Sequence, residues 1–454
     1  MASRKRYAQV GLGCRGDMYS QAILERYSAV AELVGLCDSN PGHVKRRVDW
    51  AAGKGVTARG YEAADFDRML RETKPDCVIV TTKDCHHDEY LCRAMEFGCD
   101  AITEKPMTTE AEKCQRIVDT QRRTGRKCVV TFNYRYSPPR TQVKDVLMSG
   151  LIGEVLSVDF TWLLDTRHGA DYFRRWHRNK ANSGGLLVHK ATHHFDIVNW
   201  WLSSIPTQVY AQGRRAFYTP QTAARYGLDP DERCLNCKEK ERCAFALDLT
   251  GSEYWRRLYL ENEQHDGYFR DRCVFSDQID IEDSMQLVVS YDSGARMSYS
   301  LNAFMPWEGY SIAFNGSKGR LEQKCQESVY VAGDGSVQGA LIPEGTTLRV
   351  YPHFAPPYAL EVWSAEGSHG GGDERLLDDL LGPNPAPDKY LHAADYRAGA
   401  YSILIGVAAN HSMRSGQPVR ISDLVSSVPR PDYPPMPSAD APLPMGRMTG
   451  NAWV

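Results

Sequence analysis

The chain has 454 residues, of which 42% are hydrophobic, and a net charge of −3. This length exceeds what one ordinary hydrophobic core accommodates, so at least two domains are expected. The nearly balanced charge gives no general attraction to nucleic acid or to a membrane surface. No apolar run approaches the roughly 18 residues that a membrane helix needs. Composition and charge therefore argue against nucleic-acid and membrane partners.

The N-terminus and the cysteines predict where the protein works. Residues 1–7 lack the apolar segment of a secretory signal and lead directly into a predicted strand. The chain contains 13 cysteines, an odd number. An odd number of cysteines without a signal peptide is typical of reduced thiols. The sequence therefore predicts a cytoplasmic protein.

A glycine-rich loop at residues 11–16 predicts a dinucleotide site. It has the spacing G-x-G-x-x-G, follows a short apolar run and precedes a helical pattern. Glycine permits the tight turn, the approach of the backbone to a pyrophosphate and the packing of helix on strand, while the helix N-terminus attracts the phosphates. The predicted phosphate-binding residues are Gly11, Gly13, Cys14, Arg15 and Gly16.

The residue after the second apolar run predicts which dinucleotide is bound. Asp38 directly follows the apolar run of residues 31–37 and lies about 20 residues beyond the glycine loop. At this position of a dinucleotide-binding domain, an acidic residue binds the ribose hydroxyls. A carboxylate there repels a 2′-phosphate and so favours NAD. Arg46 and Arg47 lie nearby and keep NADP as the alternative.

Strand and helix patterns alternate over residues 1–136, which predicts a doubly wound parallel sheet with helices on both faces, an α/β Rossmann domain. In such sheets the ligands lie beyond the C-terminal strand ends. Three predicted strands, residues 76–81, 99–104 and 127–132, end at polar residues. These are Thr81, Thr82, Glu104, Lys105, Asn133 and Tyr134. We expect them on one rim, beside the nicotinamide.

Beyond about residue 137 the pattern changes to longer strands joined by hairpin signals at residues 291–294 and 315–319. It predicts an α+β domain over residues 137–425 with an open, mainly antiparallel sheet. A helical pattern at residues 391–413 is a candidate to pack back on the first domain. The proline-rich tail, residues 426–454, is expected to lie extended over a surface or between subunits.

Four motifs occur together in this chain: the glycine loop, Glu104-Lys105-Pro106 after the fifth strand, Gly184-Gly185 with His193-x-x-Asp196, and Gly370-Gly371-Gly372-Asp373 before a helix. Together they resemble the motifs of one enzyme family, the glucose–fructose oxidoreductase and inositol dehydrogenase (Gfo/Idh/MocA) family. The resemblance spans roughly residues 6–413. It implies tightly held NAD(P), hydride transfer at a carbohydrate carbinol, and a second-domain sheet that often forms the interface of a homo-oligomer, here a dimer or tetramer.

Lys105 is the lysine of the family motif. Removing a hydride from a secondary alcohol requires a base for the hydroxyl proton. Because Lys105 follows a buried strand, we expect its pKa to be lowered toward neutrality. The alternative is a surface lysine. Glu104 is expected to fix this loop or to contact the cofactor, and Tyr134 is a further acid–base candidate.

A histidine-rich segment, residues 184–201, has helical spacing. His189 and His193 fall on one face, and Lys190 and His194 on the adjoining face. The family usually has Asp at the position of His189, so this chain departs from the common pattern. We predict active-site roles for His189, Lys190 and His193, leave His194 between substrate contact and core, and expect Asp196 to orient His193.

A basic, aromatic stretch lies just before this segment, on a predicted loop. Arginine binds anionic groups bidentately and aromatic rings stack on sugars, so an anionic sugar is one candidate substrate. The alternative is a solvated basic loop or one that reaches a neighbouring subunit. The predicted substrate-binding residues are Arg167, Arg174, Arg175, Trp176 and Arg178, together with His194.

Four cysteines form a further cluster in the sequence: Cys234, Cys237, Cys243 and Cys273. A C-x-x-C pair with two more cysteines can hold a structural zinc. Free thiols are an equal alternative, and a disulfide is a weaker one.

The sequence thus predicts an NAD-dependent enzyme acting on a sugar or glycoside, with Lys105 or His193 accepting the hydroxyl proton after hydride leaves a carbon, C3 being favoured. A second hypothesis is a redox-neutral glycosidase, in which oxidation at C3 is followed by elimination, addition of water and reduction. It needs more acid–base groups, which His189, Lys190 and Tyr134 could supply. A third is a non-catalytic NAD-binding sensor, which would not need these groups.

Overall fold

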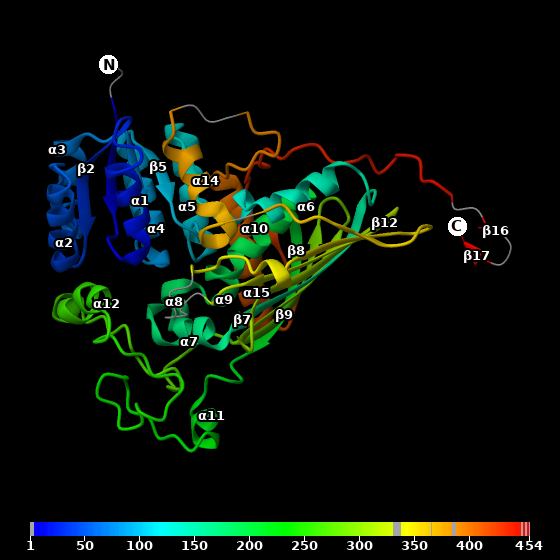
Figure 1. Cartoon of the computed structure of the whole chain (residues 1–454). Helices are drawn as coiled ribbons and strands as arrows, with labels where there is room; N and C mark the ends of the chain where they lie inside the picture. Colours follow the sequence, from blue (N-terminus) through cyan, green and yellow to red (C-terminus); the bar gives the residue numbers. More distant parts are fainter. Residues whose placement is uncertain are drawn as a thin grey trace.

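A parallel six-stranded sheet forms the first domain of the computed structural model (Figure 1), in the order β3-β2-β1-β4-β5-β6. Its strands are β1 (Lys5–Val10), β2 (Ala31–Asp38), β3 (Arg59–Glu62), β4 (Cys77–Val80), β5 (Asp100–Thr103) and β6 (Cys128–Val130). Its helices are α1 (Cys14–Leu24), α2 (Pro41–Gly53), α3 (Phe66–Thr73), α4 (His87–Phe97) and α5 (Ala111–Thr124). The predicted Rossmann fold is confirmed.

The strand residues explain why helices cover both faces of this sheet. In β4, Val78 and Val80 face one buried cluster, while Cys77 and Ile79 face the other. Successive side chains of a strand point to opposite faces, and a continuous apolar run is therefore typical of a strand buried on both sides. Because all six strands are parallel, their C-terminal ends form one rim, which carries the residues predicted at the strand ends.

The structure describes residues 4–329, 337–364, 366–383, 387–445, 448–449 and 452–453. Part of the predicted tail, residues 446, 447, 450, 451 and 454, lies outside these ranges. The tail begins at the first domain, where the Ser426 N–H donates to Gln115. Farther along, Val428 and Tyr433 pack against the hydrophobic core, and the Tyr401 hydroxyl donates to the Val428 carbonyl.

The second domain contains a nine-stranded sheet in the order β14-β13-β12-β11-β7-β10-β9-β8-β15. Its strands are β7 (Val155–Asp165), β8 (Pro206–Arg214), β9 (Ser284–Tyr291), β10 (Arg296–Met305), β11 (Glu308–Gly316), β12 (Gly319–Glu327), β13 (Thr347–Pro352), β14 (Tyr358–Leu360) and β15 (Val419–Arg420). All pairs are antiparallel except β10 with β7. The predicted open, mainly antiparallel sheet is confirmed.

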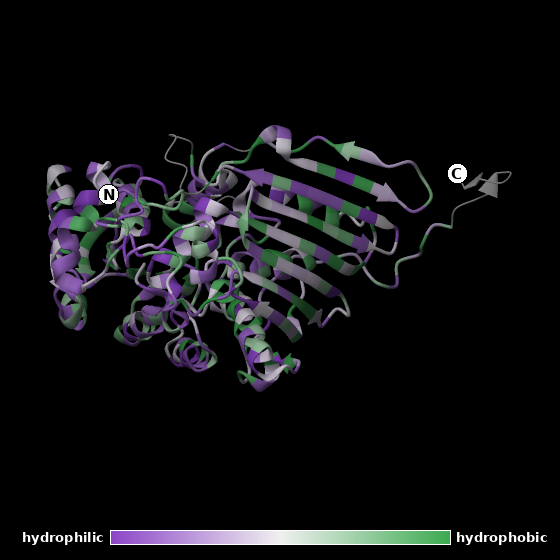
Figure 2. Ribbon diagram, turned by 90° about the horizontal axis from the view of Figure 1, so that it is seen from below, coloured by the Kyte–Doolittle hydropathy of each residue, from purple (hydrophilic) through white to green (hydrophobic). Residues whose placement is uncertain are grey.

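Helices cover one face of this sheet and leave the other open. They are α6 (Pro138–Met148), α7 (Thr166–Arg174), α8 (Lys180–Ser183), α9 (Leu186–His189), α10 (Ala191–Leu202) and α15 (Tyr396–Ser415). Helix α14 (Ser368–Leu381) packs on α6 and on α1 of the first domain instead. Exposure alternates residue by residue along β9 and β10, as expected when only one face is covered. Figure 2 shows the open face, with the strands in front of the helices.

Helix α15 also connects the two domains. Gly399 in its first half lies against Met107 and Val130 of the first domain, and the same helix packs on α9 and α10. This helix therefore packs back on the first domain, as the sequence suggested. It places the histidine-rich segment directly beside the rim of the parallel sheet.

Two local predictions in this region were wrong. The basic stretch expected to be a loop forms α7 and a short 3₁₀ turn, η4 (Trp176–Arg178), because the Asp165 carboxylate caps α7 by accepting from the Arg167 N–H. The histidine-rich segment is not one helix either: it breaks at Lys190, between α9 and α10.

A long insertion, residues 215–283, leaves the sheet after β8 and returns at β9. It carries α11 (Pro220–Arg225), α12 (Glu253–Leu258) and α13 (Glu263–Asp266). In Figure 1 this green segment lies below both domains, with α12 beneath α2. Among the described residues, no helix is long and apolar enough to cross a membrane.

Candidate active site

The glycine loop has the geometry that a dinucleotide requires. Gly11 has φ +87°, and a Cβ there would lie 2.4 Å from the Thr81 carbonyl carbon, so only glycine fits. A Cβ on Gly13 would meet no atom within 4 Å, which leaves space above the start of α1. Gly13 caps α1 without any side-chain hydrogen bond, so the first N–H groups of the helix face that space. The loop therefore fits a pyrophosphate.

Asp38 stands at the end of β2, beside this loop. Its Oδ2 accepts from the Leu12 N–H at 2.5 Å, and its Oδ1 accepts from the Asn40 N–H at 2.8 Å. Arg46 and Arg47 both pair with Asp17 instead of turning toward Asp38. The carboxylate is thus held at the ribose position without a neighbouring arginine directed at a 2′-phosphate, which favours NAD over NADP.

Arg15 and Glu104 are joined within the protein. Arg15 Nε donates to Glu104 Oε1 at 2.6 Å, and the Tyr19 hydroxyl donates to the same oxygen at 2.8 Å. The Arg15 guanidinium also pairs with Asp373, to which the Asn133 amide donates at 2.6 Å. These contacts fix the loop between β5 and α5, which is one of the two roles predicted for Glu104.

Lys105 lies where the two domains meet. The Lys105–Pro106 peptide bond is cis, and the ammonium Nζ donates to the His189 carbonyl at 3.3 Å. Burial lowers the pKa of Lys105 to about 8, an effect opposed by Asp84. A lysine with a pKa near working pH is suited to general base catalysis. The structure thus brings the motif lysine to the histidine-rich segment.

Asp84 is a site residue that the sequence analysis missed. Its Oδ2 lies 2.5 Å from His189 Nδ1, so a carboxylate from the first domain pairs with an imidazole from the second. Burial raises the pKa of Asp84 and lowers that of His189. The signal was available, because Asp84 follows the same strand end as Thr81 and Thr82. The His177 ring packs against His189 with centroids 4.1 Å apart.

His193 and Tyr134 lie face to face beside this pair. Their rings stack with centroids 4.4 Å apart, and both side chains are buried. Burial and the nearby ammonium of Lys105 lower the pKa of His193 well below its usual value, so its imidazole is neutral near neutral pH. Within the described part of the chain, His193 Nδ1 has no hydrogen-bond partner. A buried, unpaired imidazole nitrogen is a candidate contact for a substrate hydroxyl.

Lys190 lies deeper in the second domain. Its Nζ donates to the Tyr134 hydroxyl at 3.4 Å and lies 4.0 Å from Glu308 Oε1. Glu308 also lies 2.9 Å from His168 Nδ1. Burial lowers the pKa of Lys190, whereas the carboxylate of Glu308 raises it. Glu308 and His168 were not predicted as site residues, because their positions depend on strand pairing across the second sheet.

The structure gives Asp196 a different partner from the predicted one and decides between the two roles considered for His194. Asp196 does not orient His193, because both of its oxygens bind the Arg135 guanidinium, at 2.6 and 2.7 Å, in a buried bidentate pair. His194 is fully buried, stacks on Trp162 and lies 2.6 Å from the Tyr299 hydroxyl. The structure thus places His194 in the core of the second domain, the structural alternative of its prediction.

The arginines predicted to bind substrate do not form one group, because several of them bind separate partners within the protein. Arg174 donates to the Phe245 carbonyl at 3.1 and 3.2 Å, and Arg178 donates to the Cys273 carbonyl at 3.3 Å, so both hold the insertion. Arg175 pairs with Asp171 at 3.1 Å. Arg167 is exposed, and Trp176 stacks on His177 with centroids 3.6 Å apart. The Trp176 ring also lies 6.0 Å from the His189 ring, centroid to centroid.

The predicted zinc site is not supported. Cys234, Cys237, Cys243 and Cys273 do line one small pocket of about 20 Å³, and all four are free thiols. Across the described ranges, however, no group of three His, Cys, Asp or Glu side chains could hold a metal ion. Burial raises the pKa of Cys273 to about 11, so the thiolate that a metal requires is disfavoured.

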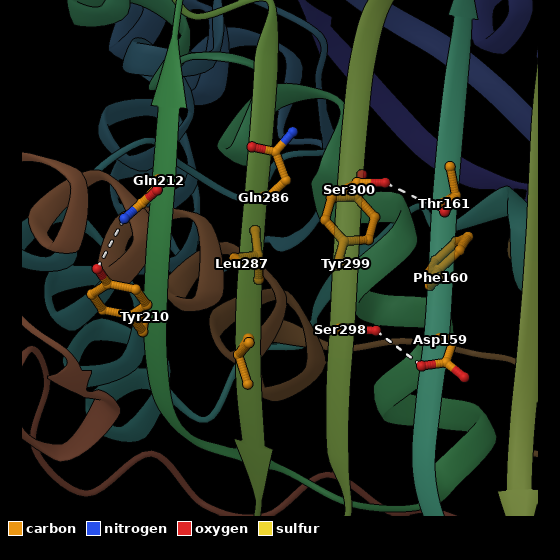
Figure 3. Close-up of a pocket in the computed structure, with 11 residues that line it drawn as sticks. Asp159, Phe160, Thr161, Tyr210, Gln212, Gln286, Leu287, Ser298, Tyr299 and Ser300 are labelled. Atoms are coloured by element: carbon orange, nitrogen blue, oxygen red, sulfur yellow. Dashed lines mark hydrogen bonds between the residues drawn. The ribbon is translucent and has the colours of Figure 1, made fainter.

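The open face of the large sheet carries a shallow depression of about 450 Å³ (Figure 3). Polar and apolar side chains both line it, and hydrogen bonds run from Gln212 to Tyr210 and from Ser298 to Asp159. The histidine-rich segment lies on the opposite, helix-covered side of the sheet. The depression is therefore not part of the candidate active site.

Comparison with known proteins identifies the family. Residues 5–132 match the model of the oxidoreductase family NAD-binding Rossmann fold, and residues 144–421 match the model of its C-terminal alpha/beta domain. The chain belongs to the Gfo/Idh/MocA oxidoreductase family. It is therefore an enzyme with an NAD-binding domain, and the predicted family is confirmed.

Relatives of this Gfo/Idh/MocA protein carry several different names. It is 37% identical to "Putative oxidoreductase YteT" of Bacillus subtilis over 91% of this chain and 97% of that protein. It is 30% identical to "Glycosyl hydrolase family 109 protein 1" of Akkermansia muciniphila over 40% of each chain. The solved WlbA dehydrogenase of Chromobacterium violaceum, in complex with NADH and UDP-GlcNAcA, has a TM-score of 0.62 and 20% identity, and covers 92% of this chain and 97% of that one. The last likeness concerns the fold alone.

Proposed function

We propose that this protein removes a hydride from a secondary alcohol of a sugar or glycoside, with NAD as the acceptor. The observation that carries the proposal is the meeting of Lys105 with the histidine-rich segment at the rim of the parallel sheet. The rim then carries Lys105 with its lowered pKa, the neutral imidazole of His193 and the glycine loop for the dinucleotide. This combination is what alcohol oxidation requires.

The rim residues fit NAD. The space above Gly13 suits a pyrophosphate, and Asp38 stands where the ribose hydroxyls would bind. Thr81 and Asn133 mark the neighbouring strand ends. Bound there, NAD supplies the hydride acceptor. The protein must contribute the orientation of the sugar and the removal of the hydroxyl proton.

We assign the proton transfer to Lys105 and the positioning of the hydroxyl to His193. Deprotonated Lys105 accepts the hydroxyl proton as the carbonyl forms, and C3 of the sugar is the favoured carbon. Stacking on Tyr134 holds the His193 ring in one orientation. Two of the four arginines expected to bind an anionic substrate donate to backbone carbonyls. A neutral sugar or glycoside is therefore the substrate class that we propose.

A redox-neutral glycosidase is the second candidate, favoured by the additional acid–base groups. Oxidation at C3 acidifies the proton on C2, a base removes it, and the bond from C1 to the glycosidic oxygen breaks. Water then adds to C1, a proton returns to C2 and the hydride returns to C3. The Asp84–His189 pair and Lys190 with Tyr134 offer the second base and acid that this route needs. The relatives named as family 109 glycosyl hydrolases agree with it.

We further propose that a second copy of the chain covers the open sheet face, as the family resemblance implies for a dimer or tetramer. The open face has exposed apolar side chains, Leu156, Tyr210 and Val288, among polar ones. Light scattering on the purified protein tests this. A monomer at micromolar concentration would contradict it.

The experiment that separates the two activities incubates the purified protein with a panel of polyols and glycosides. Mass spectrometry first identifies any nucleotide that copurifies. Accumulating NADH with an oxidised sugar indicates net oxidation. Release of the aglycone without net NADH, and with deuterium incorporated at C2 in deuterated water, indicates hydrolysis. Bound NAD with no reaction on any member of the panel would contradict both candidates and favour a sensor.

A further inference from the structure

The insertion is not confined to the second domain, because α12 and α13 lie against the first. They contact the N-terminal ends of α1 and α2, which is the side of the parallel sheet that bears the glycine loop. Asn40 Nδ2 donates to the Asn262 carbonyl at 3.1 Å and to the Asp266 carboxylate at 3.0 Å. His43 Nε2 lies 2.9 Å from the Leu258 carbonyl. The Tyr254 hydroxyl donates to Asp17 at 2.8 Å.

The fit between the two surfaces is close. A Cβ on Gly42, at the start of α2, would lie only 1.7 Å from Asn262 Oδ1. Any other residue at position 42 would therefore displace the side chain of Asn262. The chain that links Asp38 to α2 is thus covered by the insertion, and α12 and α13 border the cofactor groove on its ribose side.

A buried cluster of arginines lies next to this contact. Arg174, Arg175 and Arg270 all face the single carboxylate of Asp171, with N–O distances of 3.8, 3.1 and 2.6 Å. Arg174, Arg270 and Asp171 have side chains less than one-tenth exposed. Three guanidinium groups against one carboxylate leave an excess of two positive charges. Burying charge without a counter-charge is costly, so this cluster calls for an anion.

Each of these arginines has an unsatisfied donor. Arg174 donates to the Phe245 carbonyl through its two terminal nitrogens. Across the residues that the structure describes, the Nε atoms of Arg174, Arg175 and Arg270 are buried and have no hydrogen-bond partner. Arg270 is also stacked against aromatic rings, with its guanidinium 5.4 Å from the ring centre of Trp255 and 5.9 Å from that of Tyr259. The Arg270 side chain is therefore fixed in place, and its Nε–H is free to donate a hydrogen bond.

The cluster lies between the two parts of the candidate site. Arg175 is within electrostatic range of Cys14, the first residue of α1, and also of Asp84 and His189. Tyr259 of the insertion is likewise within range of Cys14. A dinucleotide extending from the glycine loop to the rim beside Lys105 would pass this position with its pyrophosphate, which carries one negative charge on each phosphate.

We infer that Arg175 and Arg270 bind the pyrophosphate of the dinucleotide, so that an insertion of the second domain completes a cofactor site built on the first. This inference rests on the proposed use of NAD. The two phosphate charges balance the excess of the cluster, and the free Nε donors supply charge-assisted hydrogen bonds. The segment formed by α12 and α13 then retains the cofactor. An anionic group on the sugar is the other source of the same chemistry.

The test compares the full-length wild-type protein with Arg270→Gln by isothermal titration calorimetry, using NAD, ADP and adenosine as probes. Arg270→Gln should weaken the binding of NAD and ADP by about tenfold or more, because a charge-assisted hydrogen bond is lost. The binding of adenosine, which has no phosphate, should not change. Arg272→Gln is the matched control, since Arg272 lies on the same segment and pairs with Glu232; it should bind all three probes as the wild type does.

Equal affinity of wild type and Arg270→Gln for ADP would overturn the inference. So would a variant that loses affinity only for an anionic glycoside, which would assign the cluster to the substrate. If Arg270→Gln does not fold, Arg175→Gln is measured in the same way, with the same expectations. A wild-type protein that binds neither NAD nor ADP would refute the proposed function itself, whereas NAD binding that Arg270→Gln and Arg175→Gln leave unchanged refutes only this inference.

Discussion

Lys105 and Lys190 are both buried lysines with a lowered pKa, but they differ in what surrounds them. Lys105 comes from the end of a strand in the first domain and points at a backbone carbonyl of the second. Lys190 lies inside the second domain, 4.0 Å from Glu308. Asp84 and Glu104 act on the Lys105 ammonium electrostatically, but among the described ion pairs they pair with His189 and Arg15 instead of Lys105.

The comparison teaches which lysine can act as a base. A carboxylate stabilises the charged form of a buried ammonium, whereas burial alone favours the neutral form. Lys105, with a pKa of about 8, loses its proton readily. Lys190 is assisted by Glu308 and donates to Tyr134, so it is suited to holding that hydroxyl in place.

Replacing Lys105 should have the largest effect. Lys105→Met removes the base and should lower kcat by about 10³-fold, within the range typical of general base catalysis. The dinucleotide loop is untouched, so NAD should still copurify. Steady-state kinetics and mass spectrometry of the bound nucleotide check both points. A loss below about tenfold would remove Lys105 from the proton transfer.

His193→Asn should lower kcat/KM by about 10²-fold, because it removes the buried, unpaired imidazole nitrogen that we propose positions the substrate hydroxyl. The adjacent His194→Phe is the matched control. His194 stacks on Trp162 in the core, so this change should leave kcat/KM close to the wild-type value and cost about 1 kcal/mol of unfolding free energy from the lost contact with Tyr299. Similar kinetic losses in both variants would contradict the assignment.

Lys190→Met should lower the rate of NADH formation in a single turnover by only about tenfold, since one hydrogen bond to Tyr134 is lost. Stopped-flow absorbance measures that rate. A much larger loss would show that Lys190 transfers a proton itself. If the loss appeared in aglycone release but not in NADH formation, Lys190 would belong to the elimination step of the glycosidase route.

The smallest effect expected is a shift of the pH profile. Lys105 must be neutral to accept a proton, so kcat/KM should rise with pH and level off above about 8. The negative charge of Asp84 raises the pKa of Lys105, so Asp84→Asn should move the rising limb to lower pH. The pH dependence of kcat/KM for both proteins gives the result. A shift to higher pH would contradict the pairing inferred here.

The first domain could be predicted well from the sequence, because its signals are local. The glycine loop, the strand ends and Lys105 all follow from patterns within a few residues, and each was found at its expected place. The prediction failed where partners are distant in the chain. Asp196 was assigned to His193, a neighbour on the same helix, but binds Arg135, which is 61 residues away. The basic stretch was taken for a loop although Asp165 supplied a helix cap.

The four cysteines show that sequence spacing can predict proximity without predicting chemistry. Their spacing alone suggested zinc, and they do gather around one pocket. Whether thiols can hold a metal depends on the directions of their sulfur atoms and on the ease of deprotonation, neither of which spacing specifies. Asp84 shows that the rule of strand ends, applied to every polar residue on the rim, would have found one more site residue.

The insertion leaves and re-enters the sheet at directly paired positions, since Arg214 lies opposite Ser284. A short turn could therefore replace the whole segment without altering strand register, and the excised piece could be transplanted between any two adjacent antiparallel strands of similar geometry. The architecture is in this sense modular: the catalytic rim belongs to the common scaffold, while the element proposed to retain the nucleotide is a detachable accessory.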